Sequence, residues 1–217
     1  MNSVVSEKTF ITNRLNVPYE NLSQSYLRAE TQLTSTSQID FQFQLNNVGG
    51  GNKIVTERLL ELNDEFVITN FFIGLKQIGS DTPTDAQHLN AQIFTWDNVK
   101  VFSGTNAANV SSVYNGSLGM TINRKQFIPE FPVRAFRRVP QTQQSTLQDA
   151  ATSFTGGVDQ YPNGLYGFYP TDPTVINGRQ TIDTSIDLGA SVDFDDSSNS
   201  VFAVAILRGY LVVNAKS

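Results

Sequence analysis

His88 is the only histidine in the chain, and the chain has no cysteine. A serine hydrolase of the usual kind needs a histidine beside a nucleophilic serine, and the sequence contains no nucleophile-elbow motif. A transition-metal site would have to be built almost entirely from carboxylates, and neither a disulfide framework nor a thiolate zinc site is possible. His88 ends the polar segment Asp85-Ala86-Gln87-His88. We therefore expect it to lie on the protein surface.

Two groups of acidic residues could bind a cation or act as acid and base. The densest group of oxygen ligands is Asp193, Asp195, Asp196 and Asn199. Its spacing lacks the glycine and the final glutamate of a helical calcium loop, so a solvated turn is the main interpretation and a calcium ion between subunits is the alternative.

The second acidic group consists of Glu57, Glu61, Asp64 and Glu65. Glycoside hydrolysis needs two carboxyl groups on opposite sides of a cleft. These four residues cluster around a predicted turn, which indicates a solvated face. The sequence thus predicts no catalytic residue, no cofactor and no enzyme.

The only concentration of basic residues is Arg134, Arg137 and Arg138, within a predicted strand over residues 131–139. Arginines beside Phe136 could stack on single-stranded nucleic acid, protect a sheet edge, or pair with acidic neighbours. The chain has 15 basic and 20 acidic residues and a net charge of −5. A protein that coats nucleic acid needs a basic surface, so we do not expect nucleic acid as a direct partner.

The elements that position these residues are predicted to be strands. Apolar residues alternate with polar residues over 39–45 and 182–188, which is typical of half-buried strands. Further strands are predicted at residues 65–77, 91–96, 99–102, 117–122, 131–139 and 201–213. Asp97-Asn98 and Asn177-Gly178 are predicted turns. Eight to ten strands at this spacing indicate an all-β sandwich or barrel over residues 39–217.

Residues 1–38 show no sustained hydrophobic period, and they end in a Ser/Thr-rich stretch at residues 34–38. This pattern predicts an N-terminal arm, which is either a free tail or a segment that orders against a neighbouring subunit. The longest apolar run, residues 201–207, is much shorter than a membrane span. We therefore expect no membrane partner.

The composition favours a protein that works through broad contacts. Charged residues make up 16% of the chain and aromatic residues 11%, while about a third of the residues are Asn, Gln, Ser or Thr. Uncharged polar side chains form hydrogen bonds across an interface without the cost of burying ions.

With these features, three stretches resemble bacteriophage virion structural proteins of the jelly-roll capsid, penton or decoration type. They are residues 57–68, residues 138–143 and the closing segment 205–214. The resemblance implies a jelly-roll-like β-sandwich, a place in the virion, and a function through contacts with copies of itself and with other virion proteins. It implies no reaction.

The candidate interface residues have no obvious partner within the chain. They are Tyr19, Tyr26, Leu27 and Arg28 in the arm, with Arg134, Arg137 and Arg138 at the strand. The alternative function is a carbohydrate-binding module or adhesin of the same fold class. Its sugar-stacking residues would be Trp96, Tyr161, Tyr166 and Tyr169.

Overall fold

A computed structural model of the protein describes residues 8–13, 22–45, 53–98, 101–104, 106–139 and 168–213. Eight strands lie within these ranges: β1 (Ser23–Gln32), β2 (Thr36–Phe41), β3 (Glu65–Ile78), β4 (Ser117–Ile122), β5 (Lys125–Pro132), β6 (Tyr169–Asn177), β7 (Ile182–Val192) and β8 (Ser200–Val212). The short helical elements between them are α2 (Asp85–Asn90), η3 (Ala107–Ser111), α3 (Ser112–Asn115) and η4 (Val133–Phe136). Among the described residues, no helix has the length and apolar character needed to cross a bilayer.

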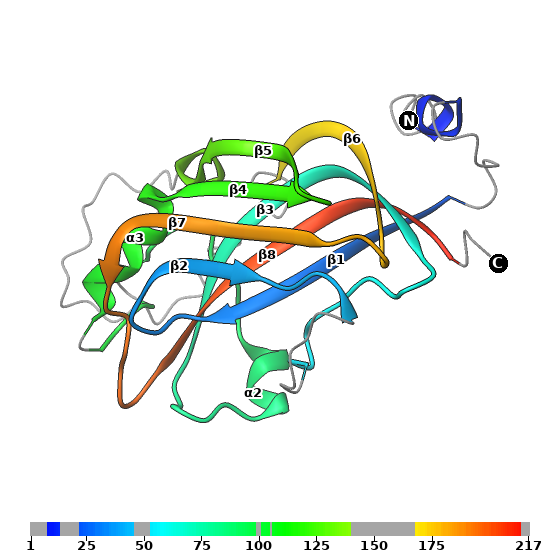
Figure 1. The fold of residues 1–217 in the computed structure, drawn as a ribbon. Helices are drawn as coiled ribbons and strands as arrows, with labels where there is room; N and C mark the ends of the chain where they lie inside the picture. Colours follow the sequence, from blue (N-terminus) through cyan, green and yellow to red (C-terminus); the bar gives the residue numbers. More distant parts are fainter. Residues whose placement is uncertain are drawn as a thin grey trace, which may run out of the picture.

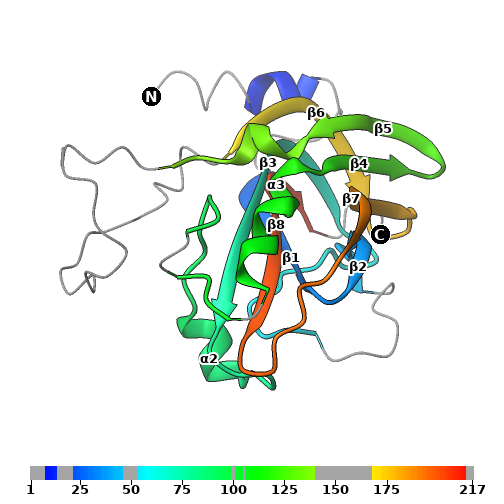
Figure 2. The same ribbon diagram turned by 90° about the vertical axis from the view of Figure 1, so that its left-hand side faces the viewer.

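The strands form two four-stranded sheets with the orders β1-β8-β3-β6 and β2-β7-β4-β5. All strand pairs are antiparallel, and the two sheets lie as two layers (Figures 1 and 2). Every connection passes from one sheet to the other except the one between β4 and β5, which is a hairpin. This is the strand order of a jelly roll. The predicted all-β, jelly-roll-like sandwich is therefore confirmed.

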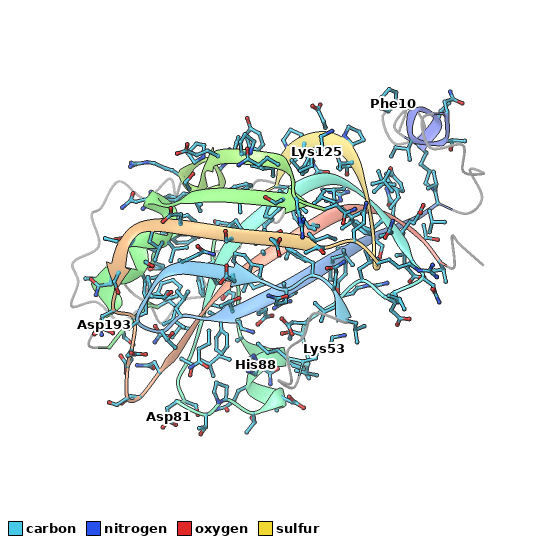
Figure 3. The ribbon with its side chains drawn as sticks, in the orientation of Figure 1. Phe10, Lys53, Asp81, His88, Lys125 and Asp193 are labelled. Atoms are coloured by element: carbon cyan, nitrogen blue, oxygen red, sulfur yellow. The ribbon has the colours of Figure 1, made fainter. Side chains whose placement is uncertain are left out.

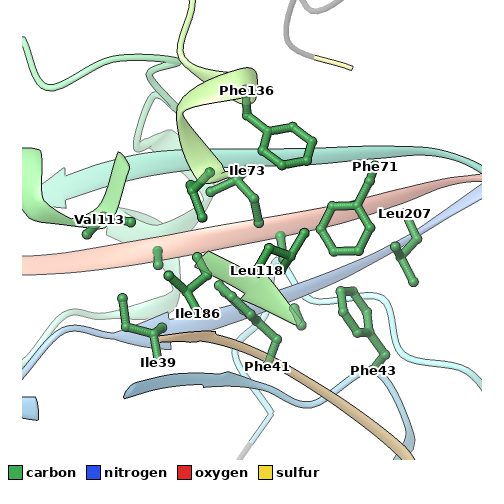
Figure 4. Close-up of a cluster of buried hydrophobic side chains, with 14 of the residues drawn as sticks. Ile39, Phe41, Phe43, Phe71, Ile73, Val113, Leu118, Phe136, Ile186 and Leu207 are labelled. Carbon is green, nitrogen blue, oxygen red and sulfur yellow. The ribbon is translucent and has the colours of Figure 1, made fainter. Parts of the chain in front are cut away.

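The core lies between the two sheets (Figure 4), where β1, β2, β3, β4, β7 and β8 contribute alternate buried residues, β6 contributes Ile176, and β5 packs partly buried residues against it. Ile39 and Phe41 of β2 face Ile73 of β3 across the layer, and Leu118 and Ile186 fill the space between them. Strands β3 and β8 are central in their sheet and are apolar on both faces over most of their length. The strands predicted at residues 65–77, 117–122, 182–188 and 201–213 are confirmed.

The predicted strand over residues 131–139 is wrong. Strand β5 begins earlier, after a two-residue turn in which Asn123 (φ 49°) and Arg124 (φ 65°) both adopt positive φ, as a tight antiparallel hairpin requires. The chain then forms the 3₁₀ helix η4. Val133 and Phe136 are three residues apart, so one turn of a 3₁₀ helix points both into the core, where both are buried.

The predicted hairpin around Asp97-Asn98 is also wrong. Over the described residues 91–98 the chain forms no strand and pairs with β3 only at Phe94, opposite Leu75. The Asn98 carbonyl accepts hydrogen bonds from the amides of Val101 and Phe102. This turn brings the Phe94 and Phe102 rings to 5.9 Å from each other in the core, which a regular hairpin would prevent.

The described residues 22–38 are not part of a separate arm, because the sandwich already begins with β1 and includes the start of β2. Strand β1 pairs with β8 along its whole length, and Leu27 lies in the core, so it is not a surface contact residue. Residues 8–13 form a helical turn whose Ile11 packs on the outer face of the same sheet, against Tyr210 and Val212. Tyr19 lies outside the described residues.

We predict that removal of residues 1–21 leaves a folded protein, whereas removal of residues 1–38 does not. The shorter deletion leaves both sheets complete, but the longer one removes the edge strand β1 and exposes β8. Circular dichroism during thermal unfolding should show a cooperative transition for the first variant only. A cooperative transition after removal of residues 1–38 would show that β1 is dispensable.

Candidate functional site

Among the described residues, the outer face of the β1-β8-β3-β6 sheet is covered at both ends and uncovered between them. At one end, Ile11 of the helical turn covers Val67, Tyr210 and Val212. At the other end, α2 places His88 against Phe202, with the ring centroids 5.0 Å apart. The uncovered middle contains a cavity of about 460 Å³, which we call the arginine groove.

The register of the strands explains why these side chains line the arginine groove. Tyr26 of β1 lies opposite Arg208 of β8, and Arg28 lies opposite Ile206. Leu27 and Ala29 point into the core, so Tyr26 and Arg28, which alternate with them along β1, point outward. Phe168, just before β6, forms the last wall and packs on Phe72 with the ring centroids 5.2 Å apart.

Two guanidinium groups, those of Arg28 and Arg208, line the arginine groove, and a third, that of Arg58, stacks on Tyr26 at its wall. Arg208 stacks over the Phe168 ring at 6.0 Å, and Arg58 stacks over the Tyr26 ring at 5.3 Å. Neither Arg58 nor Arg208 forms an ion pair with a carboxylate in the described part of the chain. Arg28 Nε is buried and has no hydrogen-bond partner among the described residues. The groove therefore offers unused cationic donors beside aromatic rings, which suits an anionic group.

Arg28 also joins the groove to a set of ionisable side chains under α2, which we call the buried charge network (Glu30, Lys76 and His88). Arg28 Nη2 lies 2.5 Å from Glu30 Oε1, and Lys76 Nζ donates to Glu30 Oε2. The Glu30 and Lys76 side chains are both 0% exposed. Lys76 Nζ lies 3.0 Å from His88 Nδ1, and Thr56 Oγ1 donates to Glu30 Oε1. Figure 3 shows His88 on α2 below the sheet.

The pKa values in this network follow from burial and pairing. Burial alone would raise the pKa of Glu30, but the hydrogen bonds from Lys76 and Thr56 and the charge of Arg28 together lower it. Burial lowers the pKa of Lys76 and outweighs the effect of Glu30. Burial and the nearby Lys76 charge lower the pKa of His88, which favours the neutral imidazole. Burial raises the pKa of Glu57, whose Oε1 accepts a hydrogen bond from the Glu30 amide.

The Glu30 and Lys76 side chains of the buried charge network are not accessible to a ligand. The network instead holds neighbouring elements in place. It holds α2 and the segment around Thr56 on the sheet, and Glu30 holds the Arg28 guanidinium from below. The expectation that His88 lies on the surface is wrong, because His88 is 7% exposed. A signal in the sequence could have indicated this. Thr84 and Gln87 form a capping box that starts α2, and one turn of helix turns His88 toward the sheet.

Of the predicted basic residues, Arg137 and Arg138 have hydrogen-bond partners among the described residues. Arg137 Nε lies 2.8 Å from Asp97 Oδ1, and Arg134 lines the same small cavity of about 180 Å³. The Arg138 amide and carbonyl both bond to Thr95. These residues belong to η4 and the segment after it, whereas Tyr26 and Arg28 belong to β1. The structure therefore does not place the two groups on one element.

Two of the candidate calcium ligands, Asp193 and Asp196, accept hydrogen bonds from backbone amides of the β7–β8 loop to which they belong. Asp193 Oδ1 accepts a hydrogen bond from the Asp195 amide, and Asp196 Oδ1 accepts from the amides of Ser198 and Asn199. Among the described residues, no three His, Asp or Glu side chains are arranged to hold a metal ion. The Asp193 and Asp196 carboxylates therefore cap backbone amides of their own loop.

The remaining candidate residues are dispersed. Glu57 is half-buried, Glu61 is exposed and Asp64 is buried, and the contacts that the structure gives do not join them across a cleft. Trp96 packs edge-on against Phe94, whereas Tyr169 packs against Phe131 and Phe136 in another cluster. Tyr161 and Tyr166 lie outside the described residues. The described aromatic residues therefore form no common platform for a sugar.

Comparisons with models of known families, with characterised proteins and with solved structures gave no significant match. The features that bear on function are thus the fold, the arginine groove and the buried charge network. The arginine groove is the accessible feature, and the buried charge network determines its position.

We predict that Lys76→Met destabilises the protein by about 3 kcal/mol or more, because it leaves the buried Glu30 carboxylate without its ammonium partner. The double variant Glu30→Gln/Lys76→Met should recover much of this loss. Urea unfolding measures both effects. Lys53→Met, which alters an exposed lysine, is the matched control and should change stability by less than about 0.5 kcal/mol. An equal effect of the two single substitutions would rule out a structural role for the pair.

We also predict that part of the pH dependence of stability comes from His88. Its pKa is below the ordinary value of 6.5 in the folded state, so the unfolded chain binds the proton first as the pH falls. The free energy of unfolding should therefore decrease from about pH 7.5 to about pH 5.5, by at most about 1.4 kcal/mol per pH unit. His88→Gln should remove this component.

Urea unfolding over this pH range, on both proteins, provides the measurement. Since His88 is the only histidine, no other imidazole contributes. The raised pKa of Glu57 acts with the opposite sign at lower pH and is retained in the variant. Identical pH profiles for the two proteins would contradict the prediction.

Proposed function

We propose that this chain is a structural subunit of a virus particle, and that it acts through contacts with copies of itself and with other virion proteins. The observation that carries the proposal is the jelly-roll strand order, β1-β8-β3-β6 against β2-β7-β4-β5. Jelly rolls occur in viral capsids, and also in lectins and other proteins. The fold alone does not decide between these functions, so the surface has to be considered as well.

Two properties of the surface support a subunit role over carbohydrate binding. The open stretch of the outer sheet face is lined by arginines and aromatic rings, and Tyr26 is 45% exposed there. Aromatic and arginine side chains are the types enriched where proteins meet. In contrast, the described aromatic residues proposed for sugar stacking, Trp96 and Tyr169, pack in separate clusters.

The proposal does not depend on an arm that orders only on assembly. The described parts of residues 1–38 pack on their own sandwich, as β1 and as the helical turn that carries Ile11. Among the described residues, it is the sandwich surface that would supply the contacts between copies. A rigid double sheet with variable loops at its ends suits this role, because the loops can be shaped to fit neighbours.

We predict that the purified full chain forms oligomers of defined size as its concentration rises, and that a variant without residues 1–21 does so as well. Sedimentation velocity and negative-stain electron microscopy over a range of micromolar concentrations measure this. Titration with oligosaccharides, followed by Trp96 fluorescence, is the parallel assay. A chain that stays monomeric at every concentration and binds an oligosaccharide saturably would replace this proposal with the carbohydrate-binding one.

A further inference from the structure

We propose that the arginine groove binds the acidic β7–β8 loop of a second copy of this chain. The acidic loop contains Asp193, Asp195 and Asp196 and connects Val192 of β7 to Ser200 of β8. This inference rests on the proposed function, because it names the contact through which copies would associate.

The arginine groove contains cationic donors that the described residues do not pair with carboxylates. Arg208 is exposed and contacts the face of Phe168 without a carboxylate partner among the described residues. Arg28 lines the cavity, and its guanidinium adds positive charge to the wall although its Nε is itself buried. The exposed Arg208 guanidinium is therefore the donor that a carboxylate entering the groove would contact. Bidentate pairing between arginine and carboxylate is among the strongest polar contacts.

The acidic loop is already shaped to present a carboxylate. Asn109 Nδ2 donates to the Asp193 carbonyl and Asn106 Nδ2 donates to the Asp195 carbonyl, each at 2.7 Å. The Asp195 amide is held by Asp193 Oδ1 at 3.0 Å. The Asp195 side chain is exposed, and no described residue donates to its carboxylate. A preordered loop loses little conformational entropy on binding.

The acidic loop cannot reach the groove of its own subunit. Strand β8 starts at the loop and rises about 3.3 Å per residue, so Arg208 lies roughly 25 Å along the strand from Ser200. Figure 3 shows Asp193 at the end of the sandwich away from Phe10. The contact must therefore join the loop of one copy to the groove of the next. Such head-to-tail contacts generate rings or extended assemblies.

Charge complementarity favours this occupant over a nucleic acid. The chain has a net charge of −5, so a polyanion would be repelled by most of the surface. A short acidic loop needs only the local positive charge of Arg28, Arg58 and Arg208. Charged contacts of this kind weaken as salt screens them.

Two charge reversals test the inference. Arg208→Glu places a carboxylate in the groove, and Asp195→Lys places an ammonium on the loop. Both side chains are exposed, and the Asp195 backbone keeps its hydrogen bonds, so both variants should fold. Each variant alone should need roughly tenfold or more protein to form the oligomers of the wild type, because like charges meet at every contact. Sedimentation velocity at low and high salt provides the measurement.

A mixture of the two variants is the decisive experiment. The loop of the Asp195→Lys variant meets the groove of the Arg208→Glu variant, and the unchanged loop and groove of the two proteins meet at the next contact. Every contact in an alternating assembly is then complementary, so equimolar mixing should restore oligomers close to the wild-type level. Lys125→Glu and Asp183→Lys, which reverse exposed charges elsewhere on the sandwich, are the matched controls and should assemble normally.

Three results would overturn the inference. Normal assembly of both reversal variants would mean that copies meet elsewhere, and the proposed function would survive. Loss of assembly only for Arg208→Glu, without rescue by mixing, would mean that the groove takes another occupant; binding of a labelled single-stranded oligonucleotide would then identify a nucleic acid. A wild-type chain that stays monomeric at all concentrations would overturn both the inference and the proposed function.

Discussion

The buried pair of Glu30 and Lys76 is the constraint on which the outer face of the β1-β8-β3-β6 sheet depends. Both side chains are fully buried, so each charge is stable there only while the other is present. The pair holds α2 on the sheet through His88 and holds Arg28 through Glu30. One end of the face is thereby closed, and the arginine groove begins where this cover ends.

The side chains on the two faces of each strand determine whether that strand could be predicted from the sequence. Strands β3 and β8 are central in their sheet and apolar on both faces, so a run of hydrophobic residues in the sequence predicts each of them. Strand β1 does not stand out, because its outward residues are Tyr26, Arg28 and Glu30, and their burial or stacking depends on partners far away in the chain. A local pattern cannot indicate such partners. The same reason explains why residues 23–32, which the sequence pattern places in an arm, form an edge strand.

The candidate site was predicted only in part. Tyr26 and Arg28 were expected at an interface and do line the groove, but Arg208 and Phe168 were not expected there, since only strand pairing brings them together. For His88, the sequence shows the capping box that starts its helix, but it does not show that the helix brings His88 into contact with Lys76. Long-range register, rather than local propensity, thus determines the site.

We propose that this jelly roll works through contacts with further copies of itself, with the outer sheet face as the docking surface. An electron cryomicroscopy map of the oligomer tests it most directly. The account predicts that a loop of a neighbouring copy fills the groove beside Arg28 and Arg208. A map in which that groove faces bulk solvent at every contact between copies would contradict it.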